Sequence, residues 1–349
     1  MQILPATEAD ADRWDQFVCK HPLGTPYHRW AYKRALEEGY GLATHYFIAQ
    51  TADGQVRGIA PAARVPGVLS AGSFCALPYC DRGEPLGADD ATTRELEAFL
   101  AQTLSPDTQL RGTRDQDQPQ QVTDDPAPGQ KVRLLLDLPD SSEALLAGFK
   151  SKHRSQINKA KKNGLTATVA NTPEAVDAFY EVFIRNMRDL GSPTHSRRWF
   201  HAVASAYGED CLIGLVRLGD QVIGAGIVLI AGTQAAIPWA STLRDFNRLA
   251  PNMLLYWSLL EAVTDRGCKR FDFGRSSYGE GTYKFKTQWG ARPVALDWRT
   301  LSGPDKHEPD MTKTNSRVGI RPAIEAIWRR LPLPVTEAIG SRLRPRISL

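Results

Sequence analysis

Polar and charged side chains stand among glycines near the end of the chain. Residues 271–276 read Phe-Asp-Phe-Gly-Arg-Ser, and residues 281–290 read Gly-Thr-Tyr-Lys-Phe-Lys-Thr-Gln-Trp-Gly. We expect a strand that ends in Gly274, Arg275 and Ser276, then a glycine-bounded turn that carries Tyr283 and Lys286 into a further strand. Glycine lets a substrate approach the backbone, and polar groups at a strand end often serve binding. The segment therefore predicts a functional site rather than a core.

The chemistry that these residues could support is transfer of an acyl group to an amine. The attacking amine must lose a proton, and the tetrahedral oxyanion must be stabilised. A charged Lys286 in a water-poor cleft could stabilise it; the alternative is a lysine that points from a strand into solvent. Arg275 and Ser276 could bind the acceptor or the leaving group, although Ser276 could instead cap a turn. No Ser-His-Asp or Cys-His pattern and no metal-ligand spacing stands out, so we expect neither a covalent acyl-enzyme nor a metal centre.

The densest positive charge lies at residues 142–163, which we predict to be one helix. Its cations are Lys150, Lys152, His153, Arg154, Lys159, Lys161 and Lys162. A solvated basic face is one interpretation. The other is that Arg154 and Lys159 line a groove between two halves of the protein and hold an anionic ligand such as a phosphate.

Further candidate residues lie in the first half of the chain. Tyr79 and Asp81 hold the place that corresponds to Arg275 and Ser276, where an Asp-containing turn is the alternative. Lys33 and Arg34 fall on a helix predicted at residues 27–38 and could reach an anionic acceptor. Their neighbours Trp30 and Tyr32 are more typical of a core.

Composition limits the class of protein. A chain of 349 residues with 42% hydrophobic and 23% charged residues is globular and long enough for two domains. A net charge of +4 permits an anionic ligand without requiring nucleic acid. The five cysteines include no Cys-x-x-Cys pair, and the first twenty residues hold four acidic side chains and no apolar run. We therefore expect reduced thiols in a cytoplasmic protein.

The elements that position these residues come in two similar sets. Apolar periodicity from residue 165 predicts strand 165–170, helices 173–190 and 196–207, strands 211–218, 222–230 and 235–243, helix 251–266 and strand 270–273. The first half repeats this order with strand 2–6, helices 8–20 and 27–38, strands 45–50, 56–64 and 73–77, helix 91–104 and a strand near Leu110. Each set has a Gly/Asp turn between apolar strands, at residues 53–54 and 219–220. We infer a tandem duplication.

The domain boundaries follow from these sets. We place a first domain at residues 1–140, a basic connecting helix at 141–164, a second domain at 165–308 and a basic tail at 309–349. Residues 112–130 are rich in Asp, Gln and Pro and are predicted to be an excursion, because strand 132–138 resumes apolar alternation afterwards.

The second set resembles the GCN5-related N-acetyltransferase (GNAT) fold. With the repeat in the first half, this resemblance implies an α/β (α+β) protein of two tandem GNAT-like domains with mixed, twisted sheets flanked by helices. In that fold, a turn before a helix holds the phosphates of acyl-coenzyme A. The turn at residues 244–250 reads Arg-Asp-Phe-Asn-Arg-Leu-Ala. It lacks the glycines that let backbone N–H groups surround a pyrophosphate.

Three motifs in the right order extend the resemblance over about residues 1–345. They are Lys152-x-Arg154-x-x-Ile157-x-Lys159-Ala160-x-Lys162-x-Gly164, residues 186–193 and residues 271–290, and the first half agrees through residues 77–81 ahead of 84–87. Together these are similar to the FemAB-like family, especially its exosortase/PEP-CTERM-associated branch.

The FemAB resemblance implies transfer of an acyl group, typically aminoacyl from a charged tRNA, to an amine of a cell-envelope or exopolysaccharide precursor. It maps a Phe-Lys pair that stabilises the transition state onto Phe285 and Lys286. We expect no permanently bound cofactor and a donor that is aminoacyl-tRNA or acyl-CoA. The alternatives are an acyl-CoA- or acyl-carrier-dependent N-acyltransferase and a non-catalytic RNA- or glycan-binding member of an export system.

The tail from Met311 combines eight basic residues with two acidic ones. Its apolar residues Ile320, Ile324, Ile327, Trp328 and Leu331 could form one face of a basic helix. Such a helix could make peripheral contact with anionic lipid, or it could pack on the second domain.

Overall fold

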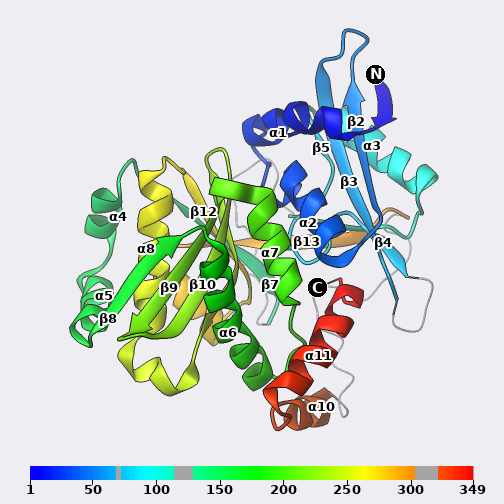
Figure 1. The fold of residues 1–349 in the computed structure, drawn as a ribbon. Helices are drawn as coiled ribbons and strands as arrows, with labels where there is room; N and C mark the ends of the chain where they lie inside the picture. The colour runs from blue at the N-terminus through cyan, green and yellow to red at the C-terminus, as the bar shows by residue number, and fades with distance from the viewer. Residues whose placement is uncertain (68–71, 114–128, 303–320, 349) are drawn as a thin grey trace.

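The computed structural model describes residues 1–67, 72–113, 129–302 and 321–348. Thirteen strands within these ranges form one mixed sheet in the order β1-β2-β3-β4-β6-β13-β7-β12-β11-β10-β9-β8, with β5 paired to β3. Two lobes meet along this sheet (Figure 1). The fold confirms the predicted α/β class and the repeated element order.

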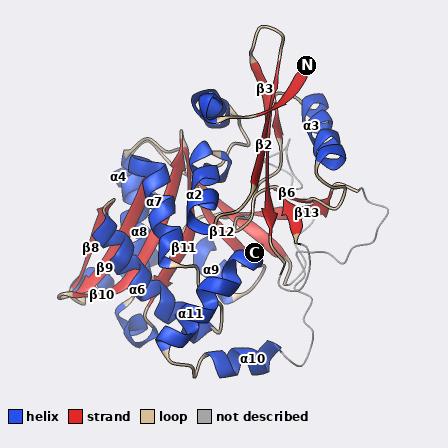
Figure 2. Ribbon diagram, turned by 45° about the vertical axis from the view of Figure 1, so that its right-hand side comes forward, coloured by secondary structure: helices blue, strands red, loops and turns tan. Residues whose placement is uncertain are grey.

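The first half forms the smaller lobe. It contains β1 (Gln2–Pro5), η1 (Glu8–Asp10), α1 (Ala11–Lys20), η2 (Pro26–His28), α2 (Trp30–Tyr40), β2 (Thr44–Gln50), β3 (Val56–Val65), β4 (Ser73–Cys75), β5 (Leu86–Gly87), α3 (Asp90–Thr103) and β6 (Gln109–Thr113). Asp89 caps α3 by accepting from the Thr92 N–H. Helix α3 covers one side of the β2–β3 hairpin (Figure 2).

The second half repeats that order with longer elements. It contains β8 (Leu165–Ala170), α6 (Pro173–Leu190), α7 (Arg197–Tyr207), η3 (Gly208–Asp210), β9 (Cys211–Leu218), β10 (Gln221–Ala231), β11 (Gln234–Thr242), η4 (Arg244–Leu249), α8 (Pro251–Asp265) and β12 (Arg270–Ser277). The equivalent pairs β4–β6 and β11–β12 are both parallel. This shared pairing supports the inferred duplication.

Two strands interleave the halves. Strand β7 (Lys131–Asp137) precedes the connecting helices, yet it pairs with β12 of the second half. Strand β13 (Arg292–Thr300) follows the second half and pairs with both β7 and β6. The lobes are therefore joined by continuous backbone hydrogen bonding.

Two sequence predictions of local structure are wrong. The single helix expected at residues 142–163 is two helices, α4 (Ser142–Gly148) and α5 (Ser151–Lys162). Phe149 and Lys150 have extended backbone between them, and the Phe149 ring is buried in the core of the second lobe. The expected strand after Gly281 is helix α9 (Gly281–Thr287), because Phe285 and Trp289, four residues apart, pack on that same core.

Helices cover both faces of the second lobe's sheet, and one core crosses between the lobes. Residues of β9 and β10 alternate between a core under α6 and α7 and a core under α8. The first of these cores continues into the small lobe, where α2 packs on α7. A Cβ at Gly39 would lie 2.8 Å from Cε3 of Trp199, so the small residue permits this close approach.

The C-terminal segment returns to the junction of the lobes. Helices α10 (Arg321–Trp328) and α11 (Leu333–Leu343) are followed by η5 (Arg344–Arg346), and α11 packs on α6 (Figure 1). Met311, Lys313, Arg317 and Ile320 of the expected basic helix lie outside the described residues. No helix within the described ranges is long and apolar enough to cross a membrane.

Candidate active site

A cavity of ≈ 380 Å³ lies where β11 and β12 diverge. These parallel strands pair only at Gln234–Ala236 and Arg270–Asp272, and the residues that follow, 237–240 and 273–275, line the cavity. The small lobe contributes Tyr27, Tyr79, Cys80 and Asp81 to the wall, and the C-terminal segment contributes Arg344. The cavity thus combines a splayed strand pair with side chains from both lobes.

Lys286 extends from α9 into this cavity. Its side chain is buried, with 8% of the residue exposed, and Nζ donates to the carbonyl oxygens of Arg275 (2.9 Å) and Gly274 (3.2 Å). Burial lowers the pKa of Lys286 to about 8, while Asp81 and Asp272 act to raise it. The ammonium is therefore charged at neutral pH and poorly solvated, which suits it to stabilise a developing negative charge.

Phe285 and Tyr283 do not line the cavity. The Phe285 ring packs on Tyr256 at 5.1 Å and on Trp289 at 6.2 Å, which fixes the rotation of α9. The Tyr283 ring contacts Tyr278 at 4.7 Å. Phe285 therefore orients the helix from which Lys286 extends.

A buried ion pair holds the strand that accepts the lysine's hydrogen bonds. Asp272 accepts from Arg133 Nε at 2.6 Å, and its other oxygen accepts from the Gly274 N–H at 2.8 Å. Gly274 has φ +70°, a conformation that favours glycine. This arrangement fixes the carbonyl groups of Gly274 and Arg275 that face Lys286.

Asp81 joins the two lobes at the cavity wall. One of its oxygens accepts from the Arg275 N–H at 2.9 Å, and the other lies 3.6 Å from Arg275 Nε. The Arg275 guanidinium stacks on Trp298, 5.0 Å from the ring centroid. Among the described residues that line the cavity, Asp81 is the single carboxylate. Contrary to the sequence expectation, Tyr79 and Asp81 follow β4, the counterpart of β11, and not β6, the counterpart of β12.

Arg344 is the site residue that the sequence did not predict. Its guanidinium lies over the Tyr79 ring, 5.1 Å from the centroid, and burial lowers its pKa. The Tyr79 hydroxyl donates to Pro345 O at 2.7 Å, and the Tyr79 N–H donates to Ser348 O at 2.8 Å. Tyr79 has φ +64°, an uncommon value for a residue other than glycine. The sequence assigned Arg344 to a basic tail, and no local pattern shows that this tail returns to the cavity.

Ser276 is buried in β12 next to β7, and its hydroxyl has no hydrogen-bond partner among the described residues. It neither caps a turn nor lines the cavity. His195 does line the cavity, but its imidazole packs on Trp199 at 5.5 Å and bonds the Tyr40 hydroxyl. Burial lowers the pKa of His195 well below its ordinary value, so this residue is neutral.

Four other predicted ligand residues lie away from the cavity. Helix α5 packs on α8 and β8 at the far side of the second lobe (Figure 1), and Arg154 donates to the carbonyls of Ala147 (3.1 Å) and Phe149 (2.5 Å). The prediction that Arg154 and Lys159 line a groove between the halves is therefore wrong. Lys33 bonds Glu37 at 2.7 Å, Arg34 pairs with Glu8, and neither basic residue lines the cavity.

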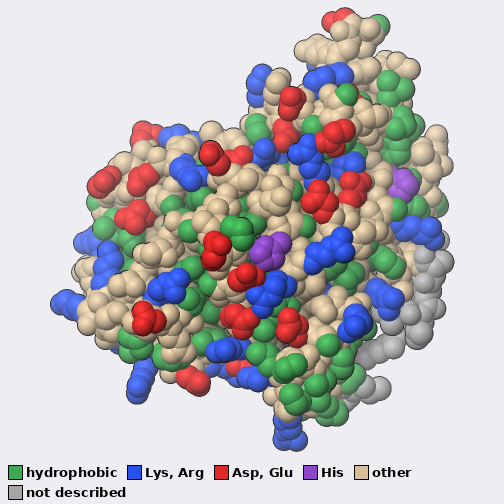
Figure 3. Space-filling view, in the orientation of Figure 1, with side chains coloured by type: hydrophobic (Ala, Val, Ile, Leu, Met, Phe, Trp, Pro, Cys, Tyr) green, Lys and Arg blue, Asp and Glu red, His purple; other side chains and the backbone are tan. Residues whose placement is uncertain are grey.

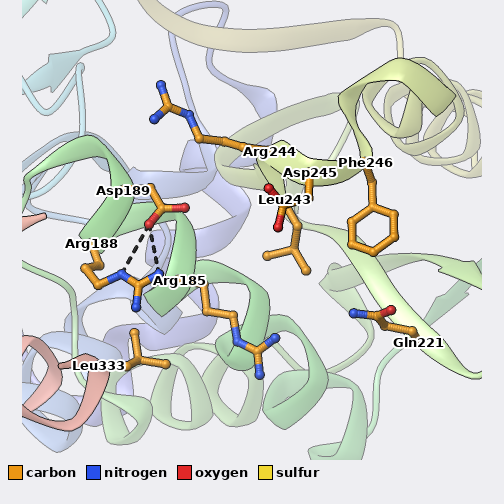
Figure 4. Close-up of a pocket in the computed structure, with 9 residues that line it drawn as sticks. All are labelled: Arg185, Arg188, Asp189, Gln221, Leu243, Arg244, Asp245, Phe246 and Leu333. Carbon is orange, nitrogen blue, oxygen red and sulfur yellow. Dashed lines mark hydrogen bonds and ion pairs between the residues drawn. The ribbon is translucent and has the colours of Figure 1, made fainter. Parts of the chain in front are cut away.

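A smaller arginine-lined pocket of ≈ 290 Å³ lies at the C-terminal end of α6 (Figure 4). Helix α6 borders both hollows: Met187 lines the cavity, whereas Arg188 lines the pocket. Leu243, the residue after β11, also lines the pocket. Arg185 and Arg244 also line the pocket, together with the carboxylates of Asp189 and Asp245, and Arg188 pairs with Asp189 at 3.0 Å. Backbone N–H groups of the adjacent η4 are already hydrogen-bonded within the turn: Phe246 N–H donates to Leu243 O, and Ala250 N–H donates to Asn247 O. Cations here come from side chains rather than from a glycine turn.

The described residues contain no group of three or more His, Cys, Asp or Glu side chains placed to hold a metal ion. All five cysteines are free, and Cys80, which lines the cavity, is buried with its thiol pKa raised.

Comparison with known proteins places this geometry in a structural context. Residues 147–287 match the family model described as acetyltransferase (GNAT) domain. No curated protein matches the chain at a significant level. The structure is similar to that of FemX, with a TM-score of 0.65 and 13% identity over 86% of this chain and 98% of that one.

Two further solved structures share the arrangement. One is a conserved protein of unknown function from Bacteroides thetaiotaomicron, with a TM-score of 0.58 and 10% identity over 85% of this chain and 98% of that one. The other is a tandem GNAT protein from the clavulanic acid biosynthesis pathway, with a TM-score of 0.51 and 13% identity over 87% of this chain and 99% of that one. At identities this low, the structural similarity establishes the fold alone, which is the tandem GNAT architecture that FemX shares. The exosortase-associated branch stays a prediction.

Proposed function

We propose that the chain is an N-acyl or aminoacyl transferase of FemAB type, with its reaction centre at Lys286. The observation that carries the proposal is a charged lysine, 8% exposed, in a cavity between diverging strands. The match of residues 147–287 to a GNAT acetyltransferase model supports acyl transfer as the reaction class.

In the proposed step, the acceptor amine attacks the carbonyl carbon of an ester or thioester donor. A C–N bond forms, and the carbonyl oxygen becomes an oxyanion that Lys286 stabilises. Collapse of the intermediate breaks the bond to the donor oxygen or sulfur. Asp81 takes the proton that the amine loses and returns it to the leaving group. Its position in the cavity wall, tied to Arg275, supports this role.

The acceptor is proposed to carry a carboxylate or phosphate as well as its amine. Arg275 and Arg344 both line the cavity, and a guanidinium offers several donors in a planar fork. A precursor of the cell envelope or of an exopolysaccharide, present as a small molecule or a glycan precursor in the cytoplasm, has this combination of groups.

A donor that bears phosphates is proposed to extend into the arginine-lined pocket. Arg185, Arg188 and Arg244 line that pocket from two elements, beside Asp189 and Asp245 (Figure 4), and the internally bonded η4 favours side-chain over backbone recognition. A charged tRNA fits this arrangement best. Acyl-CoA or an acyl carrier is the second candidate, favoured by the GNAT match.

The non-catalytic RNA- or glycan-binding alternative is less well supported. It gives no role to a desolvated lysine in an enclosed position. On the face that Figure 3 shows, basic and acidic side chains are interspersed, which does not by itself separate an RNA-binding protein from an enzyme that takes a charged tRNA.

A transfer assay with a donor panel tests the proposal. Purified chain is incubated with labelled aminoacyl-tRNA or acetyl-CoA and with amino sugars or lysine-containing peptides, and mass spectrometry follows amide formation. We expect transfer by the wild-type chain, retention in Lys284→Ala and loss of about 10²–10³-fold in Lys286→Ala. Equal transfer by both variants would remove Lys286 from the mechanism. Stabilisation of the fold by coenzyme A but not by tRNA would reverse the order of donors.

A further inference from the structure

A second, larger pocket of ≈ 800 Å³ lies on the second lobe, where α4 and α5 face the end of α9. Leu136, Leu145, Phe149, Met253 and Trp289 give it an apolar lining. The volume is in the range of pockets that hold small organic ligands. It is separate from the cavity that contains Lys286, because the two have no lining residue in common: Lys286 lines that cavity, whereas residues 287–290 line this pocket.

The break between α4 and α5 forms this pocket. Gly148 ends α4, and a Cβ at that position would meet no atom within 4 Å. Phe149 then turns inward and contacts Trp289 at 5.5 Å, while His153 from the first turn of α5 contacts the same ring at 4.1 Å. Residues on both sides of the break, including Gly148 and Lys150, line the pocket.

The charged side chains that line the pocket are all basic. Lys150 and Lys152 line it and are exposed, and no hydrogen bond or ion pair in the described structure engages either ammonium. None of the described lining residues is acidic. An apolar recess bordered by two cations is complementary to a molecule with an apolar body and an anionic end.

Two lining residues also carry unsatisfied polar atoms. His153 Nε2 and Trp289 Nε1 are buried without a hydrogen-bond partner among the described residues. Buried polar atoms without partners are uncommon, so each needs an explanation. Both atoms have almost no exposed surface, so a molecule in the pocket would reach them only after a change in side-chain position, and the site does not depend on them.

We propose that this pocket binds an anionic amphiphile, with an aliphatic chain against Leu145, Phe149 and Met253 and a carboxylate or phosphate beside Lys150 and Lys152. Fatty acids and lipid phosphates share this chemistry. The site is distinct from the proposed transfer centre and does not depend on it.

Calorimetric titration of the full chain with octanoate, decanoate and dodecanoate, each below its micelle concentration, tests the proposal. Affinity should rise about fourfold for each added methylene. Dodecyl phosphate should bind as well, and dodecyltrimethylammonium at least tenfold more weakly. Tighter binding of dodecanoate would indicate a fatty acid, and tighter binding of dodecyl phosphate a lipid phosphate; either result supports the site.

Variants locate the binding. Gly148→Phe fills the recess and should abolish binding, and Ala144→Phe, at an exposed lining position, serves if the first variant unfolds. Lys150→Glu/Lys152→Glu should weaken dodecanoate about tenfold, whereas the matched Lys159→Glu/Lys162→Glu, outside the lining, should not. Absence of binding by both anions, equal affinity for the cationic detergent, or unchanged binding after the recess is filled would overturn the proposal.

Discussion

Replacing Lys286 with methionine should lower activity without lowering stability at neutral pH. The chain buries a charged ammonium whose pKa falls from 10.5 to about 8. That difference corresponds to about 3 kcal/mol by which folding disfavours the charged form. Methionine removes this cost but leaves the carbonyls of Gly274 and Arg275 without their donor, at about 1 kcal/mol each. The free energy of unfolding at pH 7 should therefore be equal to or about 1 kcal/mol above that of the wild type.

The pH dependence of this difference is the sharper measurement. Between pH 8 and 10.5 the native lysine loses its proton while the unfolded lysine keeps it, so the unfolded state binds more protons and wild-type stability rises with pH. Relative to Lys286→Met, the wild type should gain about 3 kcal/mol across this window, which urea unfolding at pH 7 and pH 10.5 measures. Lys284→Met, exposed on the same helix, is the control and should show no such change. Two results would contradict a buried, desolvated ammonium. One is a difference in free energy of unfolding between wild type and Lys286→Met that does not change with pH, and the other is a loss of more than about 2 kcal/mol of stability in Lys286→Met at pH 7.

Four further predictions address the other proposed roles. Asp81→Asn should lower kcat of amide formation about 10²–10⁴-fold with little change in KM if Asp81 is the base; a change in KM alone would make it a binding residue. Arg344→Ala should raise KM for an anionic acceptor about tenfold, whereas Arg342→Ala, exposed on α11, should not. Arg185→Ala/Arg244→Ala should raise KM for the phosphate-bearing donor and reduce its salt dependence, with Arg248→Ala, outside the pocket lining, as the matched control. Ile324→Asp/Ile327→Asp should reduce sedimentation with anionic liposomes if the exposed apolar face of α10 contacts membrane, and unchanged sedimentation would refute that contact.

The sequence predicted the architecture because the apolar periodicity of each element repeats in both halves. It also identified Asp81, Arg275 and Lys286, since these residues stand beside glycines or in motifs with a family resemblance. The structure places those three together in one cavity wall. Which of them act in the reaction stays a proposal.

What the sequence could not predict depends on long-range packing. The break at Phe149 and the helix at residues 281–287 are decided by which side chains the second lobe's core accepts, and helix and strand propensities alone do not separate these outcomes. Arg154 was expected at the lobe junction because of charge density, but charge says nothing of which side of the sheet a helix covers. Arg344 was missed because its neighbours in space are 265 residues away in sequence, as the contact with Tyr79 shows.

The exchange of β7 and β13 between the halves has a consequence for how substrates enter. Strand β7 pairs with β12, and β13 pairs with both β7 and β6. Separating the lobes would therefore break the backbone hydrogen bonds between these strands. The C-terminal segment at the cavity wall contacts Tyr79 through hydrogen bonds to Pro345 and Ser348, so moving that segment would break fewer backbone hydrogen bonds than separating the lobes. The same ladder makes either half a poor candidate for separate expression, since a cut after residue 164 removes β7 from β12 and exposes that edge of the sheet to solvent.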